Sequence, residues 1–109
     1  MTGSMRIVVV SRDERFRRGV RALLWTGGHL WLAGEAADAA SAAVVCSLGR
    51  PDVVILDGLL SAGDTRDVVR CVGRIRPETR IVRWTCPSSA GSGEGLLVTL
   101  ADDGAPAPE

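Results

Sequence analysis

A short aliphatic run in the middle of the chain, residues 53–56, places the strongest constraint on the fold. It reads Val-Val-Ile-Leu, follows Pro51-Asp52 and ends at Asp57-Gly58. Because the run is short and apolar throughout, it predicts a parallel strand that is buried on both faces. In an open α/β sheet ligands bind beyond the carboxyl ends of the strands, which places Asp57 at the functional edge. Taken alone, Asp57-Gly58 is equally consistent with a turn in which the Asp side chain bonds its own backbone.

Further segments have the composition of strands, and helical patterns separate them. The predicted strands are residues 6–10, 29–36, 53–57 and 80–85; the predicted helices run from Ser11 to Gly27, from Ala39 to Leu48 with Asp38 as cap, and from Asp64 or Thr65 to Pro77. Ser11 and Glu14 have the spacing of a capping box. This alternation predicts right-handed crossovers and a doubly wound parallel sheet, in the order 2-1-3-4 if the first strand lies beside the third.

This strand order gathers four side chains at one end of the sheet. The first, third and fourth predicted strands end at Ser11 and Arg12, at Asp57, and at Thr85. We call this edge of the sheet, where the carboxyl ends of the strands meet, the mouth. Any binding or chemistry of the fold is expected there, beside the switch point between the first and third strands. The single histidine, His29, has no second ligand or nucleophile near it in the sequence, so we expect a loop residue there.

The charge balance and the cysteines narrow the class of protein. Basic and acidic residues number 13 each, which disfavours direct contact with nucleic acid or with a membrane surface. The basic residues are all arginine, and no apolar run approaches the roughly 20 residues of a membrane-spanning helix. Cys46, Cys71 and Cys86 lack metal-ligand spacing, so we expect reduced thiols in a cytoplasmic protein.

Five segments, taken in order, resemble the receiver domains of response regulators in two-component signalling. They are Arg6–Val10, Phe16–Leu24, Gly34–Ala36, Pro51–Asp57 and Pro77–Val82. The resemblance covers about residues 5–86 and is to receivers that precede helix-turn-helix output domains. It implies a flavodoxin-like α/β fold, a phospho-accepting aspartate at Asp57, and a switch hydroxyl at Thr85 that contacts the phosphoryl group.

The chain departs from the receiver pattern just after the first strand. Where the family has an acidic pair, this chain has Ser11 and Arg12. Mg²⁺ requires hard oxygen ligands, and phosphoryl transfer to a carboxylate requires that cation to offset the gathering negative charge. We therefore expect that the chain has no metal ligands and that it binds Mg²⁺ weakly or not at all. We expect no other cofactor and no enzymatic activity. Asp13 lies one residue too late and is expected to be a helix-start acid; the family's lysine after strand four is also missing.

Two placements of Arg12 follow from this departure. Its guanidinium either pairs with Asp57 in a bidentate bridge or points to solvent. In the first case it imitates the missing cation and holds Thr85 and the loops in one state. That pairing predicts that Arg12→Asp restores Mg²⁺ binding, and an unchanged metal titration of the variant would count against it.

The chain is expected to divide into three regions, of which only the middle one is a folded domain. Residues 1–4 have the appearance of a cloning remnant, residues 5–86 form the receiver-like domain, and residues 87–109 form a flexible, degenerate segment. Leu96–Ala105 resembles the family's fourth helix, after which strand five and helix five are missing.

A missing fifth strand leaves an unpaired edge on the strand at 80–85. Such edges recruit another chain, which predicts a homodimer with Val82 and Trp84 near the contact. Arg83 lies in the middle of this strand, and a buried guanidinium is costly unless paired. Arg83 therefore indicates either an edge position or a carboxylate partner.

The function favoured by these features is that of a degenerate receiver. Such a domain regulates signal transduction or transcription through protein contacts, with phosphorylation at Asp57 impaired, and its partner is a histidine kinase or an output domain. The alternatives are a conventional phospho-accepting receiver, a small-ligand switch, and a structural dimerisation module of the same fold. A flavodoxin-like enzyme or nucleotide binder is disfavoured because no Gly-rich turn follows the first strand and no base lies beside a nucleophile.

Overall fold

The computed structural model describes residues 4–25, 28–85 and 96–99, and for residues 85 and 96–99 it describes the backbone alone. The strands are β1 (Met5–Val10), β2 (Leu30–Ala36), β3 (Val53–Asp57), β4 (Arg80–Thr85) and β5 (Leu96–Thr99), and the helices are α1 (Glu14–Trp25), α2 (Ala39–Gly49) and α3 (Ala62–Ile75). The type and order of the elements predicted up to residue 85 are confirmed. The predicted cloning remnant lies largely outside the described residues.

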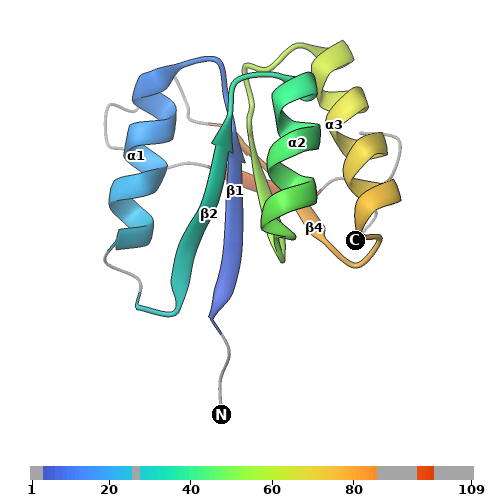
Figure 1. Ribbon diagram of the computed structural model, residues 1–109. Coiled ribbons are helices and arrows are strands. Elements are labelled where there is room, and N and C mark those ends of the chain that lie inside the picture. The colour runs from blue at the N-terminus through green and yellow to red at the C-terminus, as the bar shows by residue number, and fades with distance from the viewer. Residues whose placement is uncertain (1–3, 26–27, 86–95, 100–109) are drawn as a thin grey trace.

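The strands form one sheet in the order β2-β1-β3-β4-β5. β1 pairs in parallel with β2 and β3, and β3 pairs in parallel with β4. α1 covers one face of the sheet, whereas α2 and α3 cover the other (Figure 1). The predicted order 2-1-3-4 of a doubly wound, flavodoxin-like sheet is therefore confirmed.

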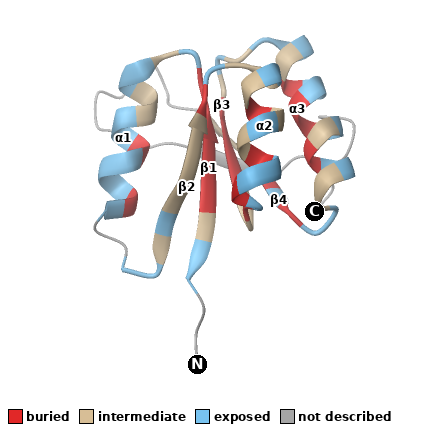
Figure 2. Cartoon of the chain, in the orientation of Figure 1, coloured by how far each residue is buried: buried red, intermediate tan, exposed pale blue. Residues whose placement is uncertain are grey.

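Strands β1 and β3 carry most of the core, and their side chains alternate between the two faces of the sheet. Val8, Val10, Val54 and Leu56 are fully buried in the cluster beneath α2 and α3. Ile55 points the opposite way and joins a second buried cluster beneath α1. Both strands are buried along most of their length (Figure 2), which holds their carboxyl ends in fixed positions. No described helix is long and apolar enough to cross a membrane.

Capping side chains set where α2 and α3 begin. Asp38 accepts the Ser41 backbone N–H at 2.9 Å, which confirms the predicted cap of α2. α3 begins after Ser61, whose hydroxyl oxygen accepts the backbone N–H of Asp64 at 3.0 Å. The prediction of Asp64 or Thr65 as the cap is therefore wrong. Asp64 instead lies in the first turn, where a negative charge interacts favourably with the helix dipole.

The end of the chain differs from the prediction. Leu96–Thr99 forms β5, antiparallel to β4, and not the start of a helix. Pairing along β4 satisfies backbone groups that a single helical turn would leave open, and an apolar run that ends in Val-Thr suits a strand. β5 therefore covers the edge of β4, so the unpaired edge that led to the predicted dimer is not present. The homodimer contact at Val82 and Trp84 is not itself tested and stays a prediction. The rest of the segment predicted to be flexible, residues 87–95 and 100–109, lies outside the described residues.

Arg83 has neither of its predicted placements among the described residues. It pairs in register with Leu56 of β3 and with Val98 of β5, so its strand is not at the edge. Its Nε is buried without a hydrogen-bond partner in the described part of the chain, where no carboxylate forms an ion pair with it. Strand pairing on both sides therefore outweighs the cost of burying part of this guanidinium.

α2 packs closely over β2 at Gly34. A Cβ built at this position would run into Cγ1 of Val45, a β-branched side chain on α2. Val45 has few rotamers open to it, so it cannot easily move aside. The absence of a side chain at Gly34 therefore allows the helix to approach the sheet.

This close packing gives a test of the fold. We expect Gly34→Ala to lower the free energy of unfolding by about 1–3 kcal/mol, because the core is overpacked. Gly19→Ala is the matched control, since Gly19 lies in α1 with nothing within 4 Å of a built Cβ. That change should raise stability by about 0.5–1 kcal/mol through helix propensity. Urea unfolding measures both, and equal effects of the two substitutions would contradict the packing described.

Candidate functional site

The carboxyl ends of three neighbouring strands meet at one mouth of the sheet. Ser11 follows β1, Asp57 is the last residue of β3, and Trp84 lies opposite Asp57 in β4. The backbone N–H of Gly58 donates to the Trp84 carbonyl at 2.8 Å, which ties the two strand ends together. As predicted from strand order, Ser11 and Asp57 are brought together from positions 46 residues apart in the sequence.

Asp57 is a buried carboxylate whose two oxygens both accept hydrogen bonds. The residue is only 7% exposed. The Ser11 hydroxyl donates to Oδ2 at 2.5 Å, and the Leu59 backbone N–H donates to Oδ1 at 2.9 Å. The second bond closes the local turn that is the alternative interpretation of the dipeptide Asp57-Gly58. A buried carboxylate needs such partners, because burying it without hydrogen bonds costs about several kcal/mol of folding free energy.

Ser11 belongs to the site and not to the helix cap. It is fully buried, and its hydroxyl oxygen accepts the Asp13 backbone N–H at 3.0 Å while its proton points to Asp57. The predicted capping box of Ser11 with Glu14 is therefore wrong. Asp13 accepts the backbone N–H of Arg15 at 2.9 Å, which confirms it as the helix-start acid and lowers the pKa of its carboxyl.

Arg12 turns away from Asp57. Its Nη2 lies 2.7 Å from Oδ2 of Asp64 in the first turn of α3, and its side chain remains 63% exposed. The hydrogen bond from Arg12 to Asp64 raises the pKa of the guanidinium. The prediction that Arg12 bridges to Asp57 is therefore wrong, and the pair that it does form with Asp64 is exposed to solvent, which screens it.

The reason lies in the chain direction just after β1. Ser11 points inward, so Arg12, the next residue, points outward. Turning the guanidinium toward Asp57 would remove it from water, which is costly when an exposed acid is within reach. The two residues at the acidic-pair positions are thus readable from the sequence, whereas their orientations are not.

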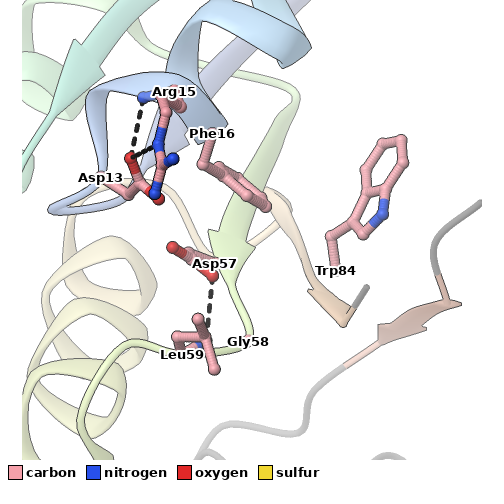
Figure 3. A pocket seen from close by; sticks show the side chains of 7 residues that line it. All are labelled: Asp13, Arg15, Phe16, Asp57, Gly58, Leu59 and Trp84. Carbon is pink, nitrogen blue, oxygen red and sulfur yellow. Dashed lines mark hydrogen bonds and ion pairs between the residues drawn. The ribbon is translucent and has the colours of Figure 1, made fainter. Parts of the chain in front are cut away.

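Asp57 lies in the wall of a pocket of about 400 Å³ (Figure 3). The lining residues are Asp13, Arg15, Phe16, Asp57, Gly58, Leu59 and Trp84. Phe16 comes from the first turn of α1, and Figure 3 shows its ring projecting toward the end of β3. The pocket thus combines two aromatic rings with two carboxylates and one arginine.

Phe16 and Trp84 line this site although the sequence pattern does not assign them to it. The sequence places Phe16 within the predicted first helix without assigning it to the site, and it places Trp84 at a dimer contact on an open strand edge. Both rings are partly buried against the cluster beneath α1. Strand register could have placed Trp84 at this site, because Trp84 is the β4 residue that pairs with Asp57. A residue in register with a strand-end acid is expected at the same mouth.

The oxygen donors beside Asp57 differ from those of a Mg²⁺ site built from an acidic pair. Ser11 supplies a hydroxyl, Arg12 is directed to Asp64, and Asp13 is bonded to Arg15. Across the residues that the structure describes, no group of three or more His, Cys, Asp or Glu side chains is placed to hold a metal ion. Mg²⁺ favours several hard oxygen ligands in octahedral array, which this donor set matches poorly.

Thr85 is the last residue of β4, as the sequence predicts. The placement of its side chain lies outside the described residues. Its role, like the phospho-accepting role of Asp57, stays a prediction.

The fold and the site define a class of protein. A parallel sheet in the order 2-1-3-4, helices on both faces and a buried aspartate at the end of β3 are the features of a doubly wound sheet with its site at the switch point. The five sequence segments that resemble receiver domains fall on β1, α1, the end of β2, β3 and the start of β4 in this fold.

Solved structures of response regulators are similar to this chain, whereas no protein-family model and no curated protein sequence matches it. The signal receiver domain of the response regulator NarL from Mycobacterium tuberculosis has 28% sequence identity and a TM-score of 0.67, over 82% of this chain and 72% of that one. A two-component response regulator of the LuxR family from Aurantimonas sp. SI85-9A1 has 25% identity and a TM-score of 0.68, over 82% and 64% of the two chains.

A third match lies in the crystal structure of the P1 domain of CheA3 in complex with CheY6 from R. sphaeroides. It has 15% identity and a TM-score of 0.69, over 83% of this chain and 70% of that one. The fold of this chain is therefore similar to that of the receiver domains of response regulators.

The hydrogen bond between Ser11 and Asp57 can be tested by mutation. We expect Ser11→Ala to lower the free energy of unfolding by about 1–3 kcal/mol, because it leaves a buried carboxylate oxygen without its donor. In an Asp57→Ala background the same change should cost clearly less, since the oxygen is gone. Ser47→Ala, an exposed position on α2, is the control and should change stability by less than about 0.5 kcal/mol. Equal costs of Ser11→Ala in both backgrounds would refute the pairing.

Proposed function

We propose that this chain is a regulatory receiver domain that acts through protein contacts and whose phosphorylation at Asp57 is impaired. The observation that carries the proposal is the state of Asp57. Its carboxylate is bonded by Ser11 and Leu59, and the side chain at the second acidic-pair position, Arg12, is directed to Asp64.

Phosphoryl transfer to a carboxylate brings negative charges together. In proteins that transfer or accept phosphoryl groups this charge is offset by a divalent cation and by basic side chains. Here Ser11 occupies one oxygen of Asp57 and adds no charge to attract a cation. We infer that Mg²⁺ binds weakly or not at all, so that Asp57 has a structural role and holds the ends of β1 and β3 together.

The proposed partners are proteins. A histidine kinase domain or an output domain is the kind of partner that the receiver fold suggests, and one of the similar structures contains a CheA3 P1 domain in complex with CheY6. Receiver domains are generally not enzymes, and we propose the same for this chain. The balanced charge of the sequence favours protein contact over direct binding of nucleic acid.

One observation favours a second candidate, a phospho-accepting receiver of ordinary function. Asp13 lines the same pocket as Asp57, so a second carboxylate is present although it is one residue removed from the family position. In this alternative Asp13 would leave Arg15 and help to hold the cation.

Acetyl phosphate with Mg²⁺ separates the two candidates. We expect intact-mass spectrometry to show no stable phosphoryl group on the wild-type chain, because the cation site is impaired. The double variant Ser11→Asp with Arg12→Asp rebuilds the acidic pair and should gain a phosphoryl group. The same double variant with Asp57→Asn is the control and should gain none.

Two results would contradict the proposal. One is a wild-type chain that is phosphorylated at Asp57, which favours the ordinary receiver. The other is a well-folded double variant, by circular dichroism, that binds Mg²⁺ and still gains no phosphoryl group, because the acidic pair would then not be what the wild type lacks.

A further inference from the structure

The charges of this chain are divided unevenly along the sequence. All 13 basic residues lie within the described ranges, together with nine of the 13 acidic residues. The other four acidic residues are Glu94, Asp102, Asp103 and Glu109, and three of them follow β5. The balanced charge of the whole sequence therefore combines a basic described part with an acidic segment after β5. This segment, residues 100–109, is called the acidic tail below.

The basic excess is concentrated on α3. Arg66, Arg70 and Arg74 follow each other at intervals of four residues on this helix, and all three are exposed. In the described part of the chain none of them forms an ion pair, although Asp67 lies on the same helix. The four arginines of α1 differ, because each of them pairs with a described carboxylate. Arg66, Arg70 and Arg74, called the arginine stripe below, therefore form a patch of unmatched positive charge.

A groove of about 360 Å³ lies along the arginine stripe. Its lining residues are Val69, Arg70, Gly73, Arg74 and Pro77. Val69 and Pro77 make part of this lining apolar, and nothing lies within 4 Å of a Cβ built at Gly73, so the groove is open there. A segment that combines carboxylates with small apolar side chains matches both parts of this lining. The acidic tail has that composition, since it reads Leu-Ala-Asp-Asp-Gly-Ala-Pro-Ala-Pro-Glu.

The direction of β5 brings the acidic tail to the end of α3. β5 runs antiparallel to β4, and its last residue, Thr99, lies opposite Val82. The chain therefore leaves β5 toward the end of the sheet where β4 begins. α3 ends there as well (Figure 1), because only residues 76–79 separate it from β4. Asp102 is three residues beyond Thr99, a reach of about 10 Å, and the whole tail can extend over about 33 Å.

We propose that the acidic tail docks on the arginine stripe of its own chain, with Asp102 and Asp103 against Arg70 and Arg74. Individual exposed ion pairs are weak, but the link to β5 keeps both carboxylates at a high local concentration beside the stripe. In this position the tail competes with any acidic segment of a partner protein for the same face of α3. The contact goes beyond the function proposed above and does not depend on whether Asp57 accepts a phosphoryl group.

The chain's own tail is a better occupant than a separate polyanion or a second copy. The unmatched arginines and the additional carboxylates balance each other within one chain, so the docked state carries no net charge that would attract nucleic acid. The tail of a second copy could reach the same stripe. It would have to exceed the local concentration of the chain's own tail, which is about millimolar for a short link.

NMR of the arginine side chains of the full chain tests the contact directly. We expect the double variant Asp102→Asn with Asp103→Asn to shift the Nε–H signals of Arg70 and Arg74, because these guanidinium groups lose their carboxylate partners. A high concentration of NaCl should move the wild-type signals in the same direction, since salt screens exposed ion pairs. Salt should have little further effect on the variant. Dilution should leave all of these signals in place, because the contact lies within one chain.

Glu14→Gln with Glu78→Gln is the matched control for the loss of two charges. Both residues are exposed, and neither belongs to the acidic tail. We expect this variant to leave the Nε–H signals of Arg70 and Arg74 at their wild-type positions. The proposal is overturned if the tail variant also leaves them in place, or if the control moves them equally. Wild-type signals that move on dilution would overturn it too, because the occupant is then a second copy.

Binding of poly-L-glutamate, used as a probe for an acidic partner, tests what the tail does. We expect the tail variant to bind this probe several-fold more tightly than the wild type, because the arginine stripe is uncovered. The control variant should change the affinity by less than about twofold, since its lost charges are screened. Adding Arg70→Gln and Arg74→Gln to the tail variant should remove the gain.

Three results of these binding measurements would contradict the proposal. The first is equal affinity of the wild type and the tail variant for poly-L-glutamate. The second is a gain that survives the loss of Arg70 and Arg74 in a variant that circular dichroism shows to be folded. The third is tight binding of a DNA duplex to the wild-type chain through the same two arginines, because the stripe is then open to a polyanion.

Discussion

The hydrogen bond from Ser11 to Asp57 is the interaction on which the rest of the site depends. Asp57 is buried at the end of a strand that has no wet face, so its carboxylate must be satisfied from within the protein. Ser11 and the Leu59 backbone provide for both oxygens. This arrangement joins the end of β1 to the turn after β3.

Once Asp57 is satisfied in this way, Arg12 is free to serve another contact. Its ion pair with Asp64 connects the segment after β1 to the first turn of α3 at the surface of the site. The pocket beside it is walled by Phe16 and Trp84 and retains acidic side chains without an acidic pair. The end of the sheet thus combines a buried, hydrogen-bonded aspartate with an exposed ion pair between Arg12 and Asp64.

The sequence predicted the strands well because buried parallel strands have a plain signature, as in 53–57. It did not predict the direction of Arg12, which depends on competition between two acids that only the folded chain brings near. It also missed β5, because a four-residue run has no periodicity and its pairing with β4 is a tertiary effect.

The central claim is that Asp57 is satisfied by protein donors in place of a divalent cation. An NMR titration of the chain with Mg²⁺ tests it most directly, with the backbone amide signals of Asp13 and Leu59 as reporters. We expect these signals not to move beyond the small, unsaturated drift seen at exposed acids. Saturable shifts confined to the amides around Asp57, absent in Asp57→Asn, would contradict it.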